Sequence, residues 1–303
     1  MHSTTAVSTG IEIAYETFGA PGGRPLLLVN GLGAQMIGWH PELCTALVAE
    51  DFFVVRFDNR DVGRSTHLQD APRPDLDAAM AGDFSSASYR LEDMAADAVG
   101  LLDALGVDQA HVVGVSLGGM IAQTMAIRHP DRVRSLTSIM STPWFGIASP
   151  TAAVQVALSA LSTSPPTTRA EAVERAVTLR KIIGSPGYPM DKPWIREVAG
   201  QSYDRCFDPT GIARQRLAVG ASGDRTAALA HVTAPALVVH GDADPWIPLR
   251  AGQATAAALP NVELLVVPGM GHDLPRGIWP TLVAAISRLA DRAESSAHPT
   301  VTS

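Results

Sequence analysis

The 303-residue sequence predicts an α/β fold in which a mostly parallel central sheet carries helices on both faces and a helical insertion. Two observations lead to this prediction. Short runs rich in Val and Leu alternate along the chain with longer stretches of helical periodicity, which is the pattern of α/β proteins. In addition, one long region, mostly in the second half of the chain, lacks such apolar runs, which indicates an insertion. Runs that are apolar on both faces are typical of parallel strands covered by helices on each side.

The predicted strands are short apolar runs that end near turn residues. The first segment differs, because Ile11, Ile13 and Tyr15 alternate after Thr9-Gly10, which predicts a strand pair or hairpin. A further strand ends near Met140. The remaining runs are residues 25–29, 52–57, 111–115, 236–240 and 262–267.

The predicted helices follow an apolar spacing of three and four residues. Residues 91–105 show it most clearly, with Glu92 and Asp93 in the first turn, where the helix dipole favours acidic side chains, and Gly106 at the end. Similar stretches follow Gly38, Leu117, Leu249 and Pro275.

Residues 143–231 interrupt the alternation of strands and helices. This region has helical patches at 151–161 and 169–183 but no clear apolar strand run. We therefore expect an α/β core over residues 1–142 and 232–292, a helical cap over residues 143–231, and a flexible tail of small and polar residues over 293–303.

Composition excludes several classes of protein. Hydrophobic residues make up 46% of the chain and charged residues 17%, which predicts a folded globular protein. The net charge of −7, without a basic block, argues against a nucleic-acid partner. The chain has neither a signal-peptide pattern nor an 18-residue apolar run, so we expect a cytoplasmic protein without a membrane span. The sequence does not define an oligomeric state.

The strongest local motif is Gly114-Val-Ser116-Leu-Gly118, which follows a predicted strand and precedes a predicted helix. This context is that of a nucleophile on a sharp strand-to-helix turn. The backbone of the turn is strained and leaves no room for side chains two residues before or after the serine, so glycine is needed at both places. We predict Ser116 as the nucleophile.

A serine needs a base, and the base needs an orienting acid. After G-x-S-x-G these partners follow in the order acid, then histidine. His272 lies in Pro-Gly-Met-Gly-His, directly after the last predicted strand, and is the predicted base. The loop after residues 236–240 offers two acids, Asp242 and Asp244. Asp242 is the weaker candidate, since it can instead hold the turn.

The developing oxyanion needs donors that are already in place. We predict the backbone N–H of Leu117 as one donor and that of Leu32, in the loop after residues 25–29, as the other. The stretch from Gly31 to Met36 is a poor dinucleotide fingerprint, because Met36 stands in place of the third glycine. The chain shows neither His-Glu-x-x-His nor a ligand cluster, so no cofactor and no metal are implied.

With these motifs in place, the chain resembles the α/β-hydrolase superfamily over about residues 5–290. The stretch from Asp58 to Ser65 (DNRDVGRS) resembles the loop after that superfamily's fourth strand. Together with GLGAQ, GVSLGG and PGMGHDLP, it resembles bacterial lipase/carboxylesterases related to aclacinomycin methylesterase. The resemblance implies a serine triad and a cap, and its acid-loop spacing Gly-x-x-Asp-x-x-x-Pro favours Asp244. Asn30 departs from the usual His-Gly of relatives.

These residues predict a serine hydrolase that cleaves a small, apolar carboxylic ester through an acyl-Ser116 intermediate. Ser116 excludes the relatives that use an aspartate nucleophile, namely haloalkane dehalogenases and epoxide hydrolases. The same triad also serves polyketide methylesterases, thioesterases, cofactor-free perhydrolases or haloperoxidases, and C–C hydrolases; a binder on a hydrolase scaffold is a further alternative. For the pocket we name Gly31, Met120, Trp144 and Tyr188, with core packing as the alternative role of the cap aromatics.

Overall fold

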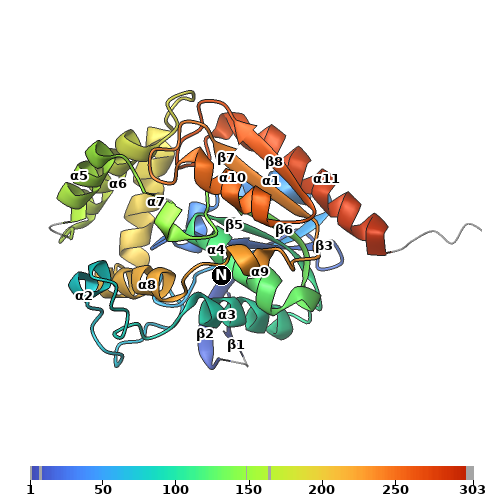
Figure 1. The fold of residues 1–303 in the computed structure, drawn as a ribbon, viewed down its shortest axis with the longest axis horizontal. Helices are drawn as coiled ribbons and strands as arrows, with labels where there is room; N and C mark the ends of the chain where they lie inside the picture. The colour runs from blue at the N-terminus through green and yellow to red at the C-terminus, as the bar shows by residue number, and fades with distance from the viewer. Residues whose placement is uncertain (1, 7–8, 148, 163–164, 298–303) are drawn as a thin grey trace, which may run out of the picture.

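The computed structural model describes residues 2–6, 9–147, 149–162 and 165–297. Over these residues the chain forms an eight-stranded sheet of order β1-β2-β4-β3-β5-β6-β7-β8 (Figure 1). The pairs β1–β2 and β2–β4 are antiparallel and the remaining pairs are parallel, which confirms the predicted mostly parallel sheet. The strands are β1 (His2–Ala6), β2 (Ile11–Phe18), β3 (Arg24–Val29), β4 (Phe52–Phe57), β5 (Ala110–Val115), β6 (Val133–Ile139), β7 (Ala236–Gly241) and β8 (Val262–Val267).

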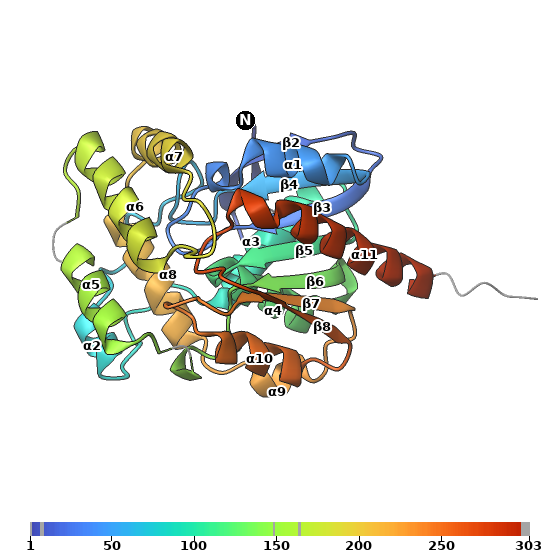
Figure 2. The same ribbon diagram turned by 90° about the horizontal axis from the view of Figure 1, so that it is seen from above.

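Helices cover both faces of the sheet (Figure 2). Successive side chains of a strand point to opposite faces, so an unbroken apolar strand supplies both cores. In β3, Leu27 and Val29 belong to one core and Leu26 and Leu28 to the other. The first core is covered by α3 (Leu91–Ala104), α4 (Leu117–Arg128) and α10 (Leu249–Ala258), and the second by α1 (Pro41–Val48) and α11 (Trp279–Ala297).

The segment between β6 and β7 lies at the edge of the sheet where the parallel strands end (Figure 2). The two predicted helices are present, and three more occur that we did not predict, of which α9 (Thr226–Leu229) is a single turn and the other two are long. Each of the two begins with an aspartate whose side chain accepts from a backbone N–H, Asp191 from Trp194 and Asp208 from Gly211, with a proline in the first turn. The helices are α5 (Ala152–Ser162), α6 (Arg169–Ile183), α7 (Lys192–Arg205), α8 (Pro209–Ala221) and α9 (Thr226–Leu229).

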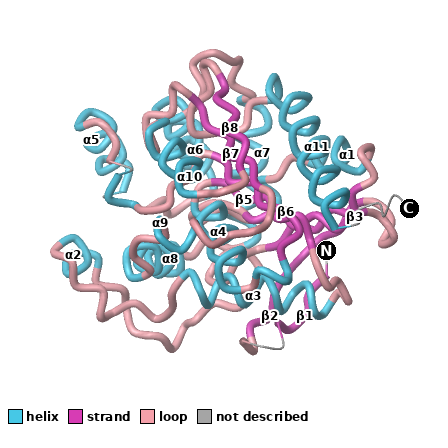
Figure 3. The backbone as a smooth tube through the Cα atoms, turned by 45° about the vertical axis from the view of Figure 1, so that its right-hand side comes forward, coloured by secondary structure: helices cyan, strands magenta, loops and turns pink. Residues whose placement is uncertain are grey.

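Short elements complete the fold. Helix α2 (Leu76–Met80) contacts α8, and both lie to one side of the strands in Figure 3. The 3-10 turns are η1 (Met36–Gly38), η2 (Pro130–Arg132), η3 (Phe145–Ile147) and η4 (Arg276–Ile278).

The C-terminal boundary of the core differs from the prediction. Helix α11 continues to Ala297, past the predicted start of the tail at Ala293. The reason is packing and charge: Ala293 is buried, and Glu294 accepts from the Arg24 guanidinium and lies 3.2 Å from Nε2 of His111. The rest of the predicted tail, residues 298–303, lies outside the described residues.

Candidate active site

Ser116 stands on the sharp turn between β5 and α4. Its backbone is left-handed, with φ 54° and ψ −119°, a strained conformation for a residue with a side chain. A Cβ on Gly114 would lie 2.1 Å from the carbonyl oxygen of Gly118, and a Cβ on Gly118 would lie 2.1 Å from that of Val29. Both glycines are therefore required by close backbone contacts, as the motif indicates.

Two hydrogen bonds join Asp244, His272 and Ser116 in series. Nδ1 of His272 lies 2.7 Å from Oδ2 of Asp244, and Nε2 lies 3.0 Å from Oγ of Ser116. Because a carboxylate only accepts, Nδ1 carries the proton, and the lone pair of Nε2 faces the serine hydroxyl. The three side chains come from the loops or turns that follow β5, β7 and β8, so the parallel topology gathers them at one edge of the sheet.

The Asp244 carboxylate is fully buried and held on both oxygens. Oδ1 accepts from the backbone N–H groups of Trp246 and Ile247, each at 2.9 Å, which leaves Oδ2 for His272. The Trp246 ring stacks on the imidazole, with centroids 5.5 Å apart and planes 25° apart. These contacts restrict the imidazole to one orientation.

A second histidine lies beside the same carboxylate. Nε2 of His240 is 2.7 Å from the carbonyl oxygen of Ile247, to which it donates, and 3.8 Å from Oδ2 of Asp244. Burial lowers the pKa of His240, so this ring stays neutral near pH 7. Asp244 therefore faces a single imidazole in a position to take a proton from Ser116. Sequence reasoning treated His240 only as the end of a strand.

Asp242, the alternative acid, has another partner. Its Oδ1 accepts from the backbone N–H of Gly269 at 2.7 Å, across to the loop that carries His272. Gly269 has φ +70°, a conformation that favours glycine. Asp242 thus supports the start of the histidine loop, and Asp244 bonds the histidine itself.

The two predicted oxyanion donors belong to the turn at Ser116 and to the loop after β3. Leu117 is the first residue of α4, where a backbone N–H has no intrahelical acceptor. Within the described part of the chain, neither this N–H nor that of Leu32 donates to a protein acceptor. The neighbouring Gly31 packs against Ser116, since a Cβ on Gly31 would lie 3.3 Å from that of Ser116.

The loop after β3 is held by polar side chains. The amide of Asn30, the residue that departs from the pattern of relatives, donates to the carbonyl oxygen of Gln35 at 2.6 Å and so closes the loop on itself. Oδ1 of Asp58, a fully buried side chain after β4, accepts from the N–H of Met36 at 2.6 Å. Arg205 of α7 pairs with the other oxygen of Asp58. The DNRDVGRS stretch therefore positions the loop that carries Leu32.

The other three predicted pocket residues differ in their surroundings. Met120 is only 3% exposed and belongs to the core between α4 and the sheet. Trp144 is 44% exposed. Tyr188 packs against the core that includes α11 and lies over Gly277.

One group of potential metal ligands lies among the described residues, formed by Asp61, His67 and Asp208. Their ligand atoms lie within 4.8 Å of one another. His67 bonds Asp208 at 2.7 Å, and Arg214 of α8 donates to Asp61 at 3.1 Å. These polar contacts join α8 to the loop after β4, and they account for the cluster as a contact between the inserted segment and the core.

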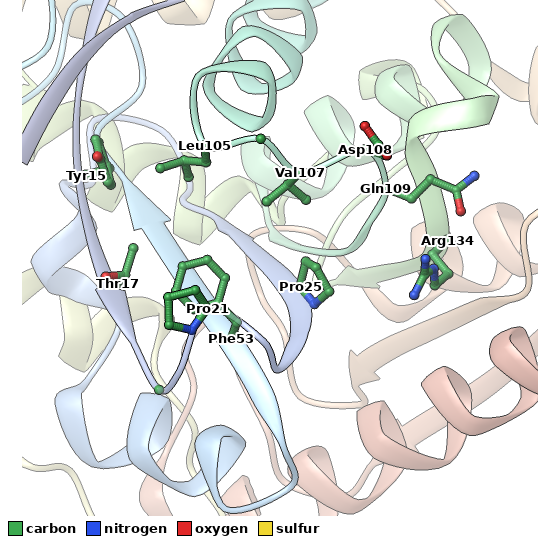
Figure 4. A pocket seen from close by; sticks show the side chains of 12 residues that line it. Tyr15, Thr17, Pro21, Pro25, Phe53, Leu105, Val107, Asp108, Gln109 and Arg134 are labelled. Atoms are coloured by element: carbon green, nitrogen blue, oxygen red, sulfur yellow. The ribbon is translucent and has the colours of Figure 1, made fainter.

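The hollow shown in Figure 4 lies away from Ser116. It is lined by Pro25, Phe53, Gln109 and Arg134, residues at or just before the amino ends of β3, β4, β5 and β6. The series of Asp244, His272 and Ser116 lies at the opposite edge of the sheet. This hollow is therefore separate from the candidate active site.

Comparison with known proteins identifies the family. The model of a family described as alpha/beta hydrolase fold matches residues 24–181, more than half of the chain. The chain is an α/β hydrolase. A second family, described as TAP-like protein, matches residues 214–280 of the hydrolase. No helix in the described residues combines the length and the apolar character that crossing a membrane requires.

Curated relatives match along most of the hydrolase. Rhodomycin D methylesterase DnrP of Streptomyces peucetius is 29% identical over 291 residues, which cover 89% of the hydrolase and 92% of DnrP. RutD of Variovorax paradoxus, provisionally named a carbamate hydrolase, is 30% identical over 275 residues, covering 86% and 90% of the two chains. The resemblance to methylesterases noted from the sequence motifs is therefore confirmed.

Solved structures share the fold. A hydrolase of Pseudomonas aeruginosa PA01 is similar with a TM-score of 0.70, 24% identity and coverage of 97% of each chain. The 2-hydroxy-6-oxo-6-phenylhexa-2,4-dienoate hydrolase of Rhodococcus sp. strain RHA1 has a TM-score of 0.73, 20% identity and coverage of 95% of the hydrolase and 96% of that chain. These likenesses confirm the predicted α/β-hydrolase fold.

Proposed function

We propose that the hydrolase cleaves small carboxylic esters through an acyl intermediate on Ser116. The observation that carries the proposal is the series of hydrogen bonds from Asp244 through His272 to Ser116, at 2.7 Å and 3.0 Å. The strained turn at Ser116 adds support, because it presents the hydroxyl beside the first N–H groups of α4. The match to a methylesterase over most of both chains favours an ester as the substrate.

In the first half of the reaction, Oγ of Ser116 attacks the ester carbonyl carbon while its proton passes to Nε2 of His272. The oxyanion accepts hydrogen bonds from the N–H groups of Leu117 and Leu32. The bond between the carbonyl carbon and the alcohol oxygen then breaks. His272 returns the proton to the departing alcohol, and the acyl group remains on Ser116.

In the second half, water takes the place of the alcohol. His272 removes a proton from the water as its oxygen attacks the acyl carbon, and the same two N–H groups hold the oxyanion. The bond to Ser116 breaks, and the proton on His272 returns to Oγ. The buried Asp244 carboxylate keeps the proton of the neutral ring on Nδ1 and stabilises the imidazolium in both halves.

Residues 143–231 form the cap in this proposal, lying over the edge of the sheet at which the ester reacts. We infer an apolar small-molecule ester, with Gly31 lining the pocket beside the reacting atoms because it already packs against Ser116. Methyl esters are the narrower class that the relatives favour, since two rhodomycin D methylesterases are 29% and 28% identical to the hydrolase.

The test compares turnover of p-nitrophenyl esters by the wild-type protein and by Ser116→Ala. We expect the substitution to lower kcat by about 10³-fold or more, because no nucleophile replaces the hydroxyl. Equal rates for the two proteins would end the proposal. A parallel panel of methyl esters, thioesters, peracid formation and β-diketones separates ester hydrolysis from the other reactions that use the same three side chains.

A further inference from the structure

A segment of the cap runs alongside the loop that carries His272. The N–H of His272 donates to the carbonyl oxygen of Ile183, the last residue of α6, at 2.6 Å. Four residues later in the cap, the N–H of Gly187 donates to the carbonyl oxygen of Gly269 at 2.9 Å. The two segments, residues 183–187 and 269–272, are therefore joined by backbone hydrogen bonds at both ends.

Two cap side chains add to this contact. Nη1 of Arg180 donates to the carbonyl oxygen of His272 at 3.1 Å. Oγ of Ser185 accepts from the N–H of Gly271 at 2.9 Å and donates to the carboxylate of Asp273. Burial lowers the pKa of Arg180, and the nearby Asp273 carboxylate opposes that shift.

Glycines make the close approach possible. A Cβ on Gly271 would lie 2.3 Å from the carbonyl oxygen of Gly184. A Cβ on Gly187 would lie 2.8 Å from the Cα of Gly269. The glycines of the Pro-Gly-Met-Gly-His motif thus have a second role besides the turn, because each admits the backbone of the cap.

The loop that carries His272 is bonded to the core at its beginning and to the cap at its end. The core holds the beginning of the loop through two hydrogen bonds. The Asp242 carboxylate accepts from the N–H of Gly269, and the N–H of Ala243 donates to the carbonyl oxygen of Met270 at 3.1 Å. At His272 the core holds only the ring, whereas the backbone N–H and C=O both bond to the cap. The position of the imidazole along the line to Ser116 therefore depends on the cap.

We propose that Arg180 and Ser185 are positioning residues for His272, so that the seated cap sets the distance between the imidazole and the nucleophile. This inference rests on the proposed ester hydrolysis. A reacting geometry must be held within about 0.5 Å, and a displacement of 1 Å can cost roughly a hundredfold in rate. Loss of these contacts should lower kcat and leave KM unchanged, because neither side chain is assigned to the pocket.

The experiment measures kcat and KM for p-nitrophenyl butyrate with Arg180→Met, Arg180→Lys and the control Arg196→Met. Active sites are counted with a fluorophosphonate probe, so that misfolded protein does not enter the rates. Arg196 is a matched control, since its guanidinium pairs with Glu174 at 2.6 Å within the cap and is half exposed. We expect Arg180→Met to lower kcat per active site about tenfold or more with KM within twofold. Arg180→Lys should recover most of the rate, since its ammonium also donates to a carbonyl.

Wild-type kcat in Arg180→Met would overturn the inference, as would an equal loss in Arg196→Met. Ser185→Ala is the second variant if Arg180→Met does not fold; it removes one oxygen and should also lower kcat at unchanged KM. Wild-type kcat in Ser185→Ala would then overturn the inference. A wild-type protein without esterase activity or probe labelling would instead refute the proposed function.

Discussion

Replacing Asp244 by asparagine reverses the hydrogen bonds of the imidazole while preserving the shape of the site. Oδ1 accepts from two backbone N–H groups, so the oxygen of the new amide must stay there and its NH2 group must take the place of Oδ2. That NH2 group donates to Nδ1 of His272, so the proton of the neutral ring moves to Nε2. The ring then presents an N–H, not a lone pair, to Ser116 and no longer accepts its proton.

The expected loss is about 10⁴-fold in kcat, equivalent to about 5 kcal/mol of barrier. The assay is the steady-state kcat for p-nitrophenyl butyrate, with the thermal midpoint measured to show that the variant is folded. Asp242→Asn is the matched control, because its amide oxygen still accepts from the N–H of Gly269. We expect its kcat to stay within about threefold of wild type. A folded Asp244→Asn variant with kcat within tenfold of wild type would refute the assigned role of Asp244.

Two further predictions concern stability. Gly118→Ala places a Cβ 2.1 Å from the carbonyl oxygen of Val29 and should lower the free energy of unfolding by about 3 kcal/mol. The control Gly22→Ala, whose Cβ would have nothing within 4 Å, should change it by less than about 0.5 kcal/mol. If urea unfolding finds Gly118→Ala as stable as Gly22→Ala, the packing described at the turn is wrong. Burial lowers the pKa of His111 from 6.5 to about 4, with Glu294 opposing the shift, so the unfolded chain takes up a proton first as the pH falls. The free energy of unfolding should therefore fall by about 3 kcal/mol between pH 6.5 and pH 4. Urea unfolding of His111→Gln over the same pH range should show a smaller fall. If the variant loses as much stability as the wild type, groups other than His111 cause the pH dependence.

Local sequence rules predicted the sheet and the turn at Ser116. Strands buried on both faces must be apolar along their whole length, so β3 and β4 stand out in the sequence. The strained turn requires glycine at positions 114 and 118 because of contacts within 2.1 Å, and this requirement is visible in five consecutive residues. Gly118 is required by the distant Val29, but its place in the motif still reveals the turn, because all the residues that the turn demands stand together in the sequence.

Features that depend on tertiary contacts were not predictable in the same way. The contact between Arg180 and the backbone of His272 joins residues 92 positions apart and leaves no local pattern. Helix α7 is largely polar and α8 has little apolar periodicity, so the clearest signal of each is its first residues, an aspartate followed by a proline within two positions. The extent of α11 was underestimated because the partners that anchor Glu294, Arg24 and His111, lie far away in the sequence.

The proposed reaction passes through a covalent bond to one serine. The most direct test is to mix the protein with a p-nitrophenyl ester, quench it in acid within milliseconds to seconds and identify the acylated peptide by mass spectrometry. We predict one acyl group on Ser116 in the wild-type protein and no such adduct in Ser116→Ala. An acyl group on another residue, or ester turnover that persists in Ser116→Ala, would contradict the claim.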